Sequence, residues 1–572
     1  MSTALIALLL ISSCLFVVTA FAQAPNVMLA RPTVASVTAS VLFEQPTESY
    51  VVYGAKRTTY TDSTSVVQHK AGVPENVLIG RCIPDTRYYY RIRYRKSGSI
   101  AFSSTDEYTF QTQRAPGSSF RFLIEADEHL YDKKGTRSMY LVTLANLAKD
   151  SADFLLSLGD IFGDDHTPAT TTSADMQELH KDYRQYLGGV CTSMPFFVCL
   201  GNYEGEMGYY LKQTPPDNIA VYGTLWRKFY YPNPVSDGFY TGNTAKEAFG
   251  VDLSENYYAW TWGDALFIVL DPYWYTTRKP DSLNGWRWTL GKGQYDWLKA
   301  TLENSEAKFT FVFAHQIIGG DANGRGGVEY ADRYEWGGRN IDGTPGFAAN
   351  RPGWYKPIKD LFKENRVTIF FHGHDHFFCK QQKDCLISQE TPQPSLPNFT
   401  NASQAEDYGY FEGQILPNSG HLRVTVGPDG TRVDYVRAYR PANETATRRN
   451  KDVSASYYIG ARNCYDSLTT SVPTLWNADY TSELVFPNPT DRITTVRLRV
   501  ENRDEAEVRI CDAQGVVIRH LLRPSIIEAG EYDIVWDGTT DDGERVADGA
   551  YWSLARSARN GEFRSTRIVY VR

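Results

Sequence analysis

Hydrophobic and polar positions alternate in short runs over the first part of the chain. Between residues 25 and 115, segments such as 34–43, 49–55 and 87–95 alternate in this way, and turns containing Pro, Gly, Asp or Thr separate them. A period of two, interrupted at short intervals by turn residues, is typical of the strands of a β-sandwich. The sequence therefore predicts an N-terminal β-sandwich over residues 25–115, followed by a linker at 114–119.

The pattern changes over residues 118–440. Hydrophobic runs of strand length alternate there with longer polar or helix-like stretches, such as 137–151 and 354–366. This alternation is typical of an α/β domain. We therefore expect a central α/β domain over residues 118–440.

The last part of the chain contains a second region rich in strands. Residues 441–482 show no periodic pattern, so we interpret them as a connector with extra loop structure. Strand-like runs return in residues 483–572, for example at 494–501, 531–538 and 549–556. The expected fold class is therefore multidomain, with a central α/β domain between two β-sandwiches.

Residues 1–22 are apolar and end in the small-residue pattern Ala20-Phe21-Ala22. This pattern is typical of a secretory signal peptide. Because no Lys or Arg precedes the apolar stretch, an uncleaved membrane anchor is the alternative. No other segment approaches the ~20 apolar residues of a membrane-spanning helix. We therefore expect a soluble, exported protein that is secreted or held at the cell surface.

Composition and charge change this picture little. The chain has 572 residues, of which 22% are charged, and a formal net charge of −8 without a long Lys or Arg run. A nucleic-acid-binding protein usually carries a strongly basic surface. We therefore expect no nucleic acid as a structural partner, although it is not excluded as a substrate.

Cysteine spacing indicates two short disulfide loops. Export permits disulfides, and Cys379 with Cys385 and Cys191 with Cys199 are the pairs that lie close in sequence. For the second pair, buried reduced thiols are an equally good interpretation.

The hydrophobic runs of the central region all end in side chains that can bind a metal ion. Asp127 and His129 end the run 120–129, Asp160 ends 153–160, Asn202 lies in 195–204, His315 ends 308–315, and His374 and His376 end 369–376. Because ligands bind at the carboxyl ends of strands in open α/β sheets, we expect these side chains to converge.

Seven such side chains are too many for one tetrahedral site and suit two metal ions that share a bridging ligand. We expect Asp160 to bridge. The other ligands divide into Asp127, His129 and His376 for the first metal ion and Asn202, His315 and His374 for the second. No thiolate belongs to the set, so iron, zinc or manganese is expected, and the ligands alone do not choose among them.

These residues occur in the ordered blocks D-x-H, G-D, G-N-H-[DE], H and G-H-x-H, and on them the chain resembles the calcineurin-like metallophosphoesterase family. The blocks are Asp127-Glu128-His129, Gly159-Asp160, Gly201-Asn202-Tyr203-Glu204, His315 and Gly373-His374-Asp375-His376. The resemblance implies a β-sandwich flanked by helices, two metal ions per chain, and hydrolysis of phosphate esters by a hydroxide that bridges the metals.

The two outer regions carry further resemblances. Residues 83–94 resemble the late strands of the fibronectin type III-like domain that precedes the catalytic domain in purple acid phosphatases. Residues 536–552 resemble FlgD-type Ig-like domains and the C-terminal sorting modules of proteins exported by some Gram-negative bacteria. The second resemblance implies a bacterial source and a C-terminal module that contacts export machinery or attaches the protein to the cell surface. An ordinary structural β-sandwich is the alternative.

Two positions depart from these families. Gly163 replaces the tyrosine that gives purple acid phosphatases their colour, so that colour is not expected. Tyr203 stands where the family usually places a histidine that contacts the phosphate or helps the leaving group. A tyrosine can donate a hydrogen bond but supplies no positive charge.

Three residues outside the ligand set are predicted to act on the substrate. Tyr203 and His166 are the predicted catalytic residues, and we expect His166, in the loop 159–168, to supply the missing acid. An exposed loop histidine is the alternative for His166. Arg325, in the Gly-rich loop after His315, is predicted to bind the phosphate of the substrate.

The leading hypothesis is a secreted, metal-dependent phosphoesterase that hydrolyses phosphate monoesters. One alternative is a phosphodiesterase or nucleotide hydrolase with the same metal centre, which Tyr203 favours because a diester demands less charge from the pocket. Another is a surface or adhesion protein with a purely structural metal site. The complete ligand set argues against the latter, since an inert site would tolerate the loss of a ligand.

Overall fold

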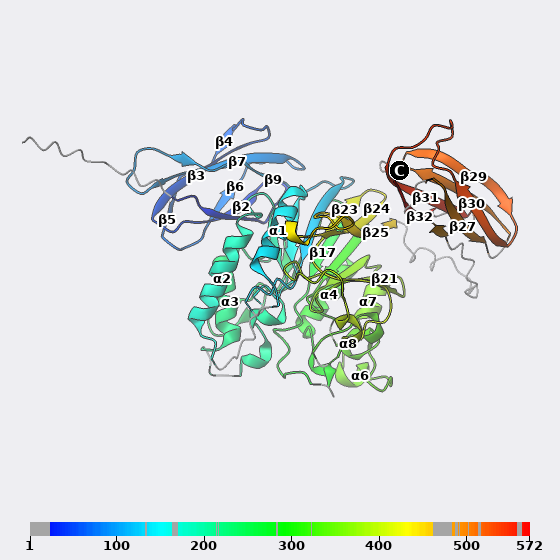
Figure 1. Cartoon of the computed structure of the whole chain (residues 1–572). Helices are drawn as coiled ribbons and strands as arrows, with labels where there is room; N and C mark the ends of the chain where they lie inside the picture. Colours follow the sequence, from blue (N-terminus) through cyan, green and yellow to red (C-terminus); the bar gives the residue numbers. More distant parts are fainter. Residues whose placement is uncertain are drawn as a thin grey trace, which may run out of the picture. The chain divides into compact units, whose positions relative to one another are not determined.

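The computed structural model describes residues 23–460, apart from 132–133, 163–169, 213, 215–216, 282–283, 318 and 322, and residues 483–571, apart from 487–489, 491, 501–502, 513–515 and 558–562. The described residues form two compact units, one ending at residue 460 and one starting at residue 483 (Figure 1). The predicted signal peptide lies outside the described residues.

The first unit begins with a β-sandwich, as predicted. Its strands are β1 (Asn26–Ala30), β2 (Val37–Leu42), β3 (Thr47–Gly54), β4 (Asp62–Ser63), β5 (Val67–His69), β6 (Glu75–Ile79), β7 (Arg87–Lys96), β8 (Ser103–Ser104) and β9 (Tyr108–Gln111). One sheet has the order β1-β2-β6, and the other has the order β4-β3-β7-β8, with β5 on β3 and β9 on β7. Strand β7 alternates buried and half-buried residues, as the period-two pattern requires, and Tyr90 and Ile92 lie in the shared core.

The central domain consists of two sheets packed face to face. The first sheet contains β10 (Phe120–Glu125), β11 (Phe154–Ser157), β12 (Phe196–Val198), β23 (Gly420–Gly427), β24 (Gly430–Arg437) and β25 (Val453–Gly460). The second contains β13 (Thr241–Gly242), β16 (Tyr258–Trp262), β17 (Ala265–Val269), β18 (Phe309–Phe313), β19 (Ile369–His372), β20 (Phe378–Lys383), β21 (Leu386–Glu390) and β22 (Gln414–Leu416). A separate hairpin pairs β14 (Lys246–Glu247) with β15 (Asp252–Leu253).

The order and direction of the strands show which hydrophobic runs lie side by side in each sheet. The first sheet has the order β12-β11-β10-β23-β24-β25, in which β10, β11 and β12 are parallel. The second has the order β13-β16-β17-β18-β19-β21-β20-β22, in which β17, β18 and β19 are parallel. Aromatic rings from both sheets fill the space between them, and Phe122 of β10 meets Phe267 of β17 edge-on at 5.1 Å between ring centroids. Strands covered on both faces read as continuous hydrophobic runs, which explains the sequence pattern.

Helices cover the outer faces of both sheets, as the family resemblance implied. The longer ones are α1 (Arg137–Lys149), α2 (Ser173–Leu187), α3 (Ile219–Tyr230), α4 (Lys292–Glu303) and α7 (Ile358–Glu364), and the short ones are α5 (Tyr334–Gly337), α6 (Phe347–Asn350) and α8 (Gln404–Asp407). Single 3-10 turns occur at η1 (Asn202–Glu204), η2 (Gly208–Tyr210), η3 (Gly285–Arg287), η4 (Val328–Tyr330) and η5 (Pro441–Asn443). Helices α1 and α2 share a core with β10 and β11, whereas α4 and α7 share one with β17, β18 and β19 (Figure 1).

The central sheet extends beyond the predicted end of the domain. Residues 441–482 were expected to be a connector, yet Val453–Gly460 forms β25 and pairs with β24 along its length. This is an edge strand whose residues are mostly half-buried or exposed. Its hydrophobic signal is weak, which explains why the sequence pattern did not reveal it.

Neither predicted disulfide loop forms, and the alternative for the second pair, buried reduced thiols, is confirmed. Cys191, Cys199 and Cys379 are buried free thiols, and Cys385 is disulfide-bonded, though not to Cys379. Cys379 pairs with Glu390 in the ladder between β20 and β21, whereas Cys385 lies in the turn that connects these strands. An extended strand rises about 3.3 Å per residue. The strand therefore carries Cys379 beyond the roughly 7 Å that a disulfide spans between Cα atoms.

The second unit is all-β, as predicted. Its strands are β26 (Glu483–Phe486), β27 (Thr494–Val500), β28 (Asp504–Cys511), β29 (Val517–Ile527), β30 (Gly530–Trp536), β31 (Gly549–Ser557) and β32 (Phe563–Tyr570). The sheets β26-β27-β30 and β29-β28-β31-β32 share a core that includes Val496, Leu498 and Val508. In the part of the chain that the structure describes, no helix is long and apolar enough to cross a membrane.

Candidate metal centre

The carboxyl ends of the parallel strands bring the predicted ligands together. Strand β10 leads to Asp127 and His129, β11 to Asp160, β18 to His315, and β19 to His374 and His376. They form two groups of buried side chains, each with ligand atoms within 4.8 Å of one another: Asp127, His129 and His376, and Asp160, His315 and His374. The first group is the one expected from the sequence, and the second contains the expected His315 and His374 together with Asp160, which was expected to bridge.

Asp160 lies between the two groups. Its Oδ2 is 3.1 Å from His315 Nε2 in its own group and 3.6 Å from His129 Nε2 in the other. Asp127 Oδ1 lies 3.4 Å from His376 Nε2 and 3.8 Å from His315 Nε2. The carboxylate of Asp160 therefore reaches both groups, as a bridging ligand must.

Buried oxygen atoms at this site fit a cation. Asp127 Oδ1, Asp160 Oδ2 and Asn202 Oδ1 are buried, and none has a hydrogen-bond partner among the described residues. A buried carboxylate oxygen without a partner is costly, so such atoms require an explanation. Carboxylate and amide oxygens that face imidazole nitrogens are a suitable donor set for iron, zinc or manganese.

The pKa shifts of these side chains indicate a strongly negative electrostatic potential at the site. Burial lowers the pKa of His315, but the carboxylates of Asp160 and Asp127 more than offset this effect and raise it to about 9. For Asp160, burial raises the pKa, but the neighbouring His315 and His129 more than offset this effect and lower the pKa to about 2. The carboxylate therefore remains ionised and attracts positive charge at this position.

In His315 and His374, a hydrogen bond to the ring nitrogen that points away from the cluster determines which nitrogen faces the site. His315 Nδ1–H donates to the carbonyl oxygen of Leu158 at 2.9 Å, and His374 Nε2–H donates to that of Asn323 at 2.7 Å. These hydrogen bonds direct His315 Nε2 and His374 Nδ1, which are 3.2 Å apart, toward the cluster, where they would be the ligand atoms for a bound ion.

Glu204 holds two of the ligand loops together, a role that the sequence did not reveal. Its carboxylate is buried and accepts hydrogen bonds from the backbone N–H groups of Asp160 at 3.1 Å and Ile161 at 2.9 Å, and also from Gly201. The backbone N–H of Tyr203 donates to Asp160 Oδ1 at 2.8 Å. The Asn202 loop thus orients the central carboxylate of the site.

The backbone at the site is strained. The ligands Asp127, His129, Asp160, His374 and His376 have positive φ angles of 62°, 44°, 57°, 81° and 69°. Side chains rarely adopt this region, at a cost of about 1–3 kcal/mol each, and such residues cluster at functional sites. Gly201 provides the necessary space, since a Cβ there would lie 2.3 Å from the backbone nitrogen of Asp160.

Arg325 packs against the loop that carries two of the histidines. Its Nη1 donates to Asp375 Oδ1 at 2.7 Å and to the carbonyl oxygen of His374 at 2.9 Å, and its guanidinium stacks on the Tyr408 ring at 4.1 Å. Arg325 therefore positions His374, and phosphate binding by this residue stays a prediction. His166 lies outside the described residues, so its predicted acid role also stays a prediction.

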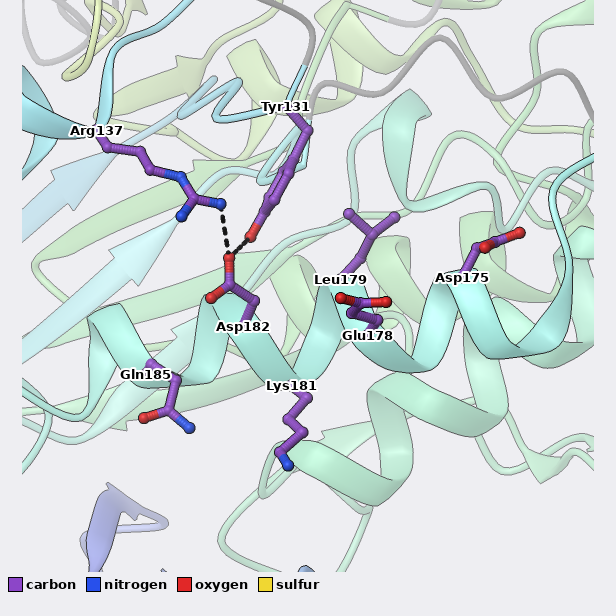
Figure 2. Close-up of a pocket in the computed structure, with 8 residues that line it drawn as sticks. All are labelled: Tyr131, Arg137, Asp175, Glu178, Leu179, Lys181, Asp182 and Gln185. Carbon is purple, nitrogen blue, oxygen red and sulfur yellow. Dashed lines mark hydrogen bonds and ion pairs between the residues drawn. The ribbon is translucent and has the colours of Figure 1, made fainter.

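A cavity of about 580 Å³ lies along α2, and Figure 2 shows the side chains that line it. Tyr131, two residues after His129, donates its hydroxyl hydrogen to Asp182, which also accepts from Arg137 Nη2 at 3.0 Å. The described residues that line this cavity include none of the predicted ligands. The cavity is therefore separate from the metal cluster.

Comparisons with known proteins agree with this geometry. Residues 120–378 match the model of the calcineurin-like phosphoesterase family, and residues 490–561 match that of the FlgD Ig-like domain. A solved structure of PhoD is 16% identical, with a TM-score of 0.55, over 79% of this chain and 92% of PhoD. Purple acid phosphatase PPD1 from yellow lupin (Lupinus luteus) seeds is 14% identical, with a TM-score of 0.51, over 80% of this chain and 78% of PPD1. No curated protein matched the chain.

Residues 120–378 therefore match the calcineurin-like phosphoesterase family, and this match supports a phosphoesterase hydrolase. The predicted family resemblance, multidomain fold class and hydrolase class are confirmed. At these identities, the solved structures support the fold alone.

Proposed function

We propose that this protein hydrolyses phosphate monoesters at a centre of two metal ions, with Asp160 as the bridging ligand. The coordination of the first ion would be completed by Asp127, His129 and His376. That of the second would be completed by Asn202, His315 and His374. The observation that carries the proposal is the position of Asp160 Oδ2, 3.1 Å from His315 Nε2 and 3.6 Å from His129 Nε2. A single ion would not need two groups of ligands with a carboxylate that reaches both.

The metal ions, when bound, would supply Lewis-acid polarisation of the phosphate and lower the pKa of water. The residues of the chain provide the rest. Asp127 and Asp160 stay ionised, because the pKa of each is lowered below its ordinary value by neighbouring histidines despite burial. The side chains of the site are buried and exclude bulk water, and this exclusion strengthens electrostatic interactions with the substrate. As predicted from the sequence, Arg325 would contact the phosphate group and Tyr203 its ester oxygen.

A phosphodiesterase is the second candidate function, and Tyr203 is the observation that favours it. Its ring meets the His129 ring edge-on at 5.0 Å, so a neutral phenol borders the site. A diester carries less negative charge than a monoester and therefore depends less on positive charge in the pocket.

Hydrolysis by the purified mature protein separates these candidates. With added manganese, zinc or iron, we expect turnover of para-nitrophenyl phosphate to exceed that of bis(para-nitrophenyl) phosphate. Chelation should abolish both activities and lower the melting temperature, because ligand at about 1,000 times its Kd stabilises a protein by about 4 kcal/mol. Chelator already saturated with zinc is the control. A protein that binds two metal ions but hydrolyses neither ester would instead have a structural metal site, as in the adhesion hypothesis.

We also propose that the chain is exported and that its C-terminal module contacts export machinery or the cell surface. The match of residues 490–561 to the FlgD Ig-like domain supports a surface module. Expression of the full chain in a Gram-negative host should give a mature N-terminus near residue 23, measured by mass spectrometry of the extracellular and membrane fractions. Full-length chain retained in the cytoplasm would contradict the proposal.

A further inference from the structure

A buried carboxylate ties the loop 373–376, which carries two candidate ligands, to two other segments of the chain. Asp375 is buried at the centre of this loop. Its carboxylate accepts hydrogen bonds from Arg325 Nη1 at 2.7 Å, from the backbone N–H of Gly326 at 3.1 Å and from the Tyr410 hydroxyl at 2.8 Å. Asp375 therefore joins the loop of Arg325 and the segment of Tyr410 to the candidate ligands.

Further contacts fix the orientation of the Arg325 guanidinium. Its Nη1 also donates to the carbonyl oxygen of His374 at 2.9 Å, and its central carbon lies 4.1 Å from the centroid of the Tyr408 ring. Gln404 Nε2 donates to the carbonyl oxygen of Asp375 at 2.9 Å, so the segment that contains Tyr408 is tied to the same loop. An arginine loses much rotamer freedom when it binds a ligand, and a side chain held in advance avoids most of that cost.

These contacts use only one end of the guanidinium. The hydrogen bonds from the Arg325 side chain to the described residues all come from Nη1, and Nε and Nη2 donate to none of those residues. Nε and Nη2 present two parallel N–H groups along one edge, a geometry that binds two oxygens of a phosphate. The Arg325 side chain is 19% exposed, so a ligand can reach it.

The charge of Arg325 acts inside the metal cluster. Burial lowers the pKa of His374 well below its ordinary value, and the charge of Arg325 lowers it further. Because Coulomb interactions weaken with distance, this effect requires the guanidinium to lie close to the ligand. A phosphate ester at the cluster would therefore meet this positive charge.

We infer that Asp375 is a positioning residue that directs the Nε and Nη2 edge of Arg325 toward the phosphate of the substrate, an inference that rests on the proposed function. Arg325 then holds two oxygens of the phosphate that are not part of the ester linkage. A monoester has three such oxygens and a diester only two, so a contact that needs two of them leaves fewer for the metal centre in a diester. The Arg325–Asp375 pair therefore favours monoesters.

Substitutions of Arg325 and Asp375 test this inference. For Arg325→Met, we expect KM for para-nitrophenyl phosphate and the inhibition constant of inorganic phosphate to rise roughly tenfold or more, while kcat changes by less than about threefold. The loss in kcat/KM on bis(para-nitrophenyl) phosphate should be smaller. Asp375→Asn should raise the same two constants about fivefold, because the guanidinium loses its orientation. Arg325→Lys should also raise them, since an ammonium group has the charge but not the two parallel donors.

The double variant Arg325→Met/Asp375→Asn should have the KM of Arg325→Met, because Asp375 acts on the substrate through Arg325. Arg333→Met is the matched control, since the Arg333 guanidinium also lies 4.1 Å from a tyrosine ring, that of Tyr330, but makes no hydrogen bond to the described loop 373–376. Metal content per chain identifies an Asp375→Asn variant that has lost the metal centre. Arg325→Met and Arg325→Lys then decide the result, because neither changes a residue of that loop.

Unchanged KM and phosphate inhibition in Arg325→Met would overturn the inference. Wild-type constants in Arg325→Lys, or a further rise in KM in the double variant, would also overturn it, because the orientation set by Asp375 would then have no role. Equal losses of kcat/KM on the two esters would contradict a contact with two phosphate oxygens. In each of these cases, an active wild type leaves the proposed function intact. A wild type that hydrolyses neither ester would overturn the proposed function together with this inference.

Discussion

Replacement of Asp160 by alanine should abolish phosphate-ester hydrolysis, with a loss in kcat/KM on the order of 10³-fold or more. Its carboxylate reaches ligands of both groups, 3.1 Å from His315 Nε2 and 3.6 Å from His129 Nε2. The variant therefore removes a carboxylate that reaches both groups and leaves His315 without its nearest counter-charge. Steady-state kinetics on para-nitrophenyl phosphate and the metal content per chain measure the effect.

Asp150→Asn is a matched control for Asp160→Ala. Asp150 is also a buried carboxylate, but it follows α1 and pairs with His421 Nε2 at 2.8 Å, apart from the predicted ligands. This control should lower the melting temperature while metal content and turnover stay close to wild type. Full metal content and normal turnover in Asp160→Ala would show that the ligand assignment is wrong.

Replacement of Arg227 by methionine should lower the free energy of unfolding by about 3–5 kcal/mol, more than any other substitution proposed for this protein. Arg227 in α3 and Glu206 are both buried, and Arg227 Nη2 lies 2.9 Å from Glu206 Oε2. Removal of the guanidinium leaves a buried carboxylate without its counter-charge. Denaturant or thermal unfolding of the metal-loaded protein measures the loss.

Two variants make this prediction specific. Arg227→Met/Glu206→Leu should recover part of the stability, because buried ion pairs can be replaced by apolar side chains of similar size. Lys292→Met removes an exposed partner of Asp296 and should cost less than about 1 kcal/mol. A loss below about 1 kcal/mol for Arg227→Met would contradict the expected importance of the buried pair. The pair also links α3 to the segment that follows Asn202 and Glu204, so activity should fall with stability.

The candidate ligands could be predicted because sequence pattern and chemistry coincide at the ends of the strands. β11, β17, β18 and β19 are buried at every residue, and β10 is buried at all but one, so each appears as a hydrophobic run. The polar residue that ends such a run is conspicuous. Parallel strands place these ends at one edge of a sheet, which makes convergence predictable without coordinates.

The residues that support the ligands were harder to predict. Glu204 was visible as the last residue of its block, but its hydrogen bonds to Asp160 and Ile161 depend on how two loops cross. Arg325 and Asp375 are 50 residues apart in sequence, and each belongs to a different loop. The pair of Cys379 and Cys385 failed for the same reason, since short spacing along a chain does not imply short distance once β20 is extended.

The order of hydrophobic runs and the polar residues at their ends were enough to predict a multidomain chain, a central domain with buried strands, and seven candidate ligands. These features are local, because the burial of a strand and the chemistry of a side chain depend on the residue types within one short segment. The position of Asp160 between two groups, the contact of Arg325 with Asp375 and the buried pair of Arg227 and Glu206 are not local. Each depends on side chains from separate segments that meet when the two sheets and their helices pack, and no periodicity along the chain encodes such a meeting.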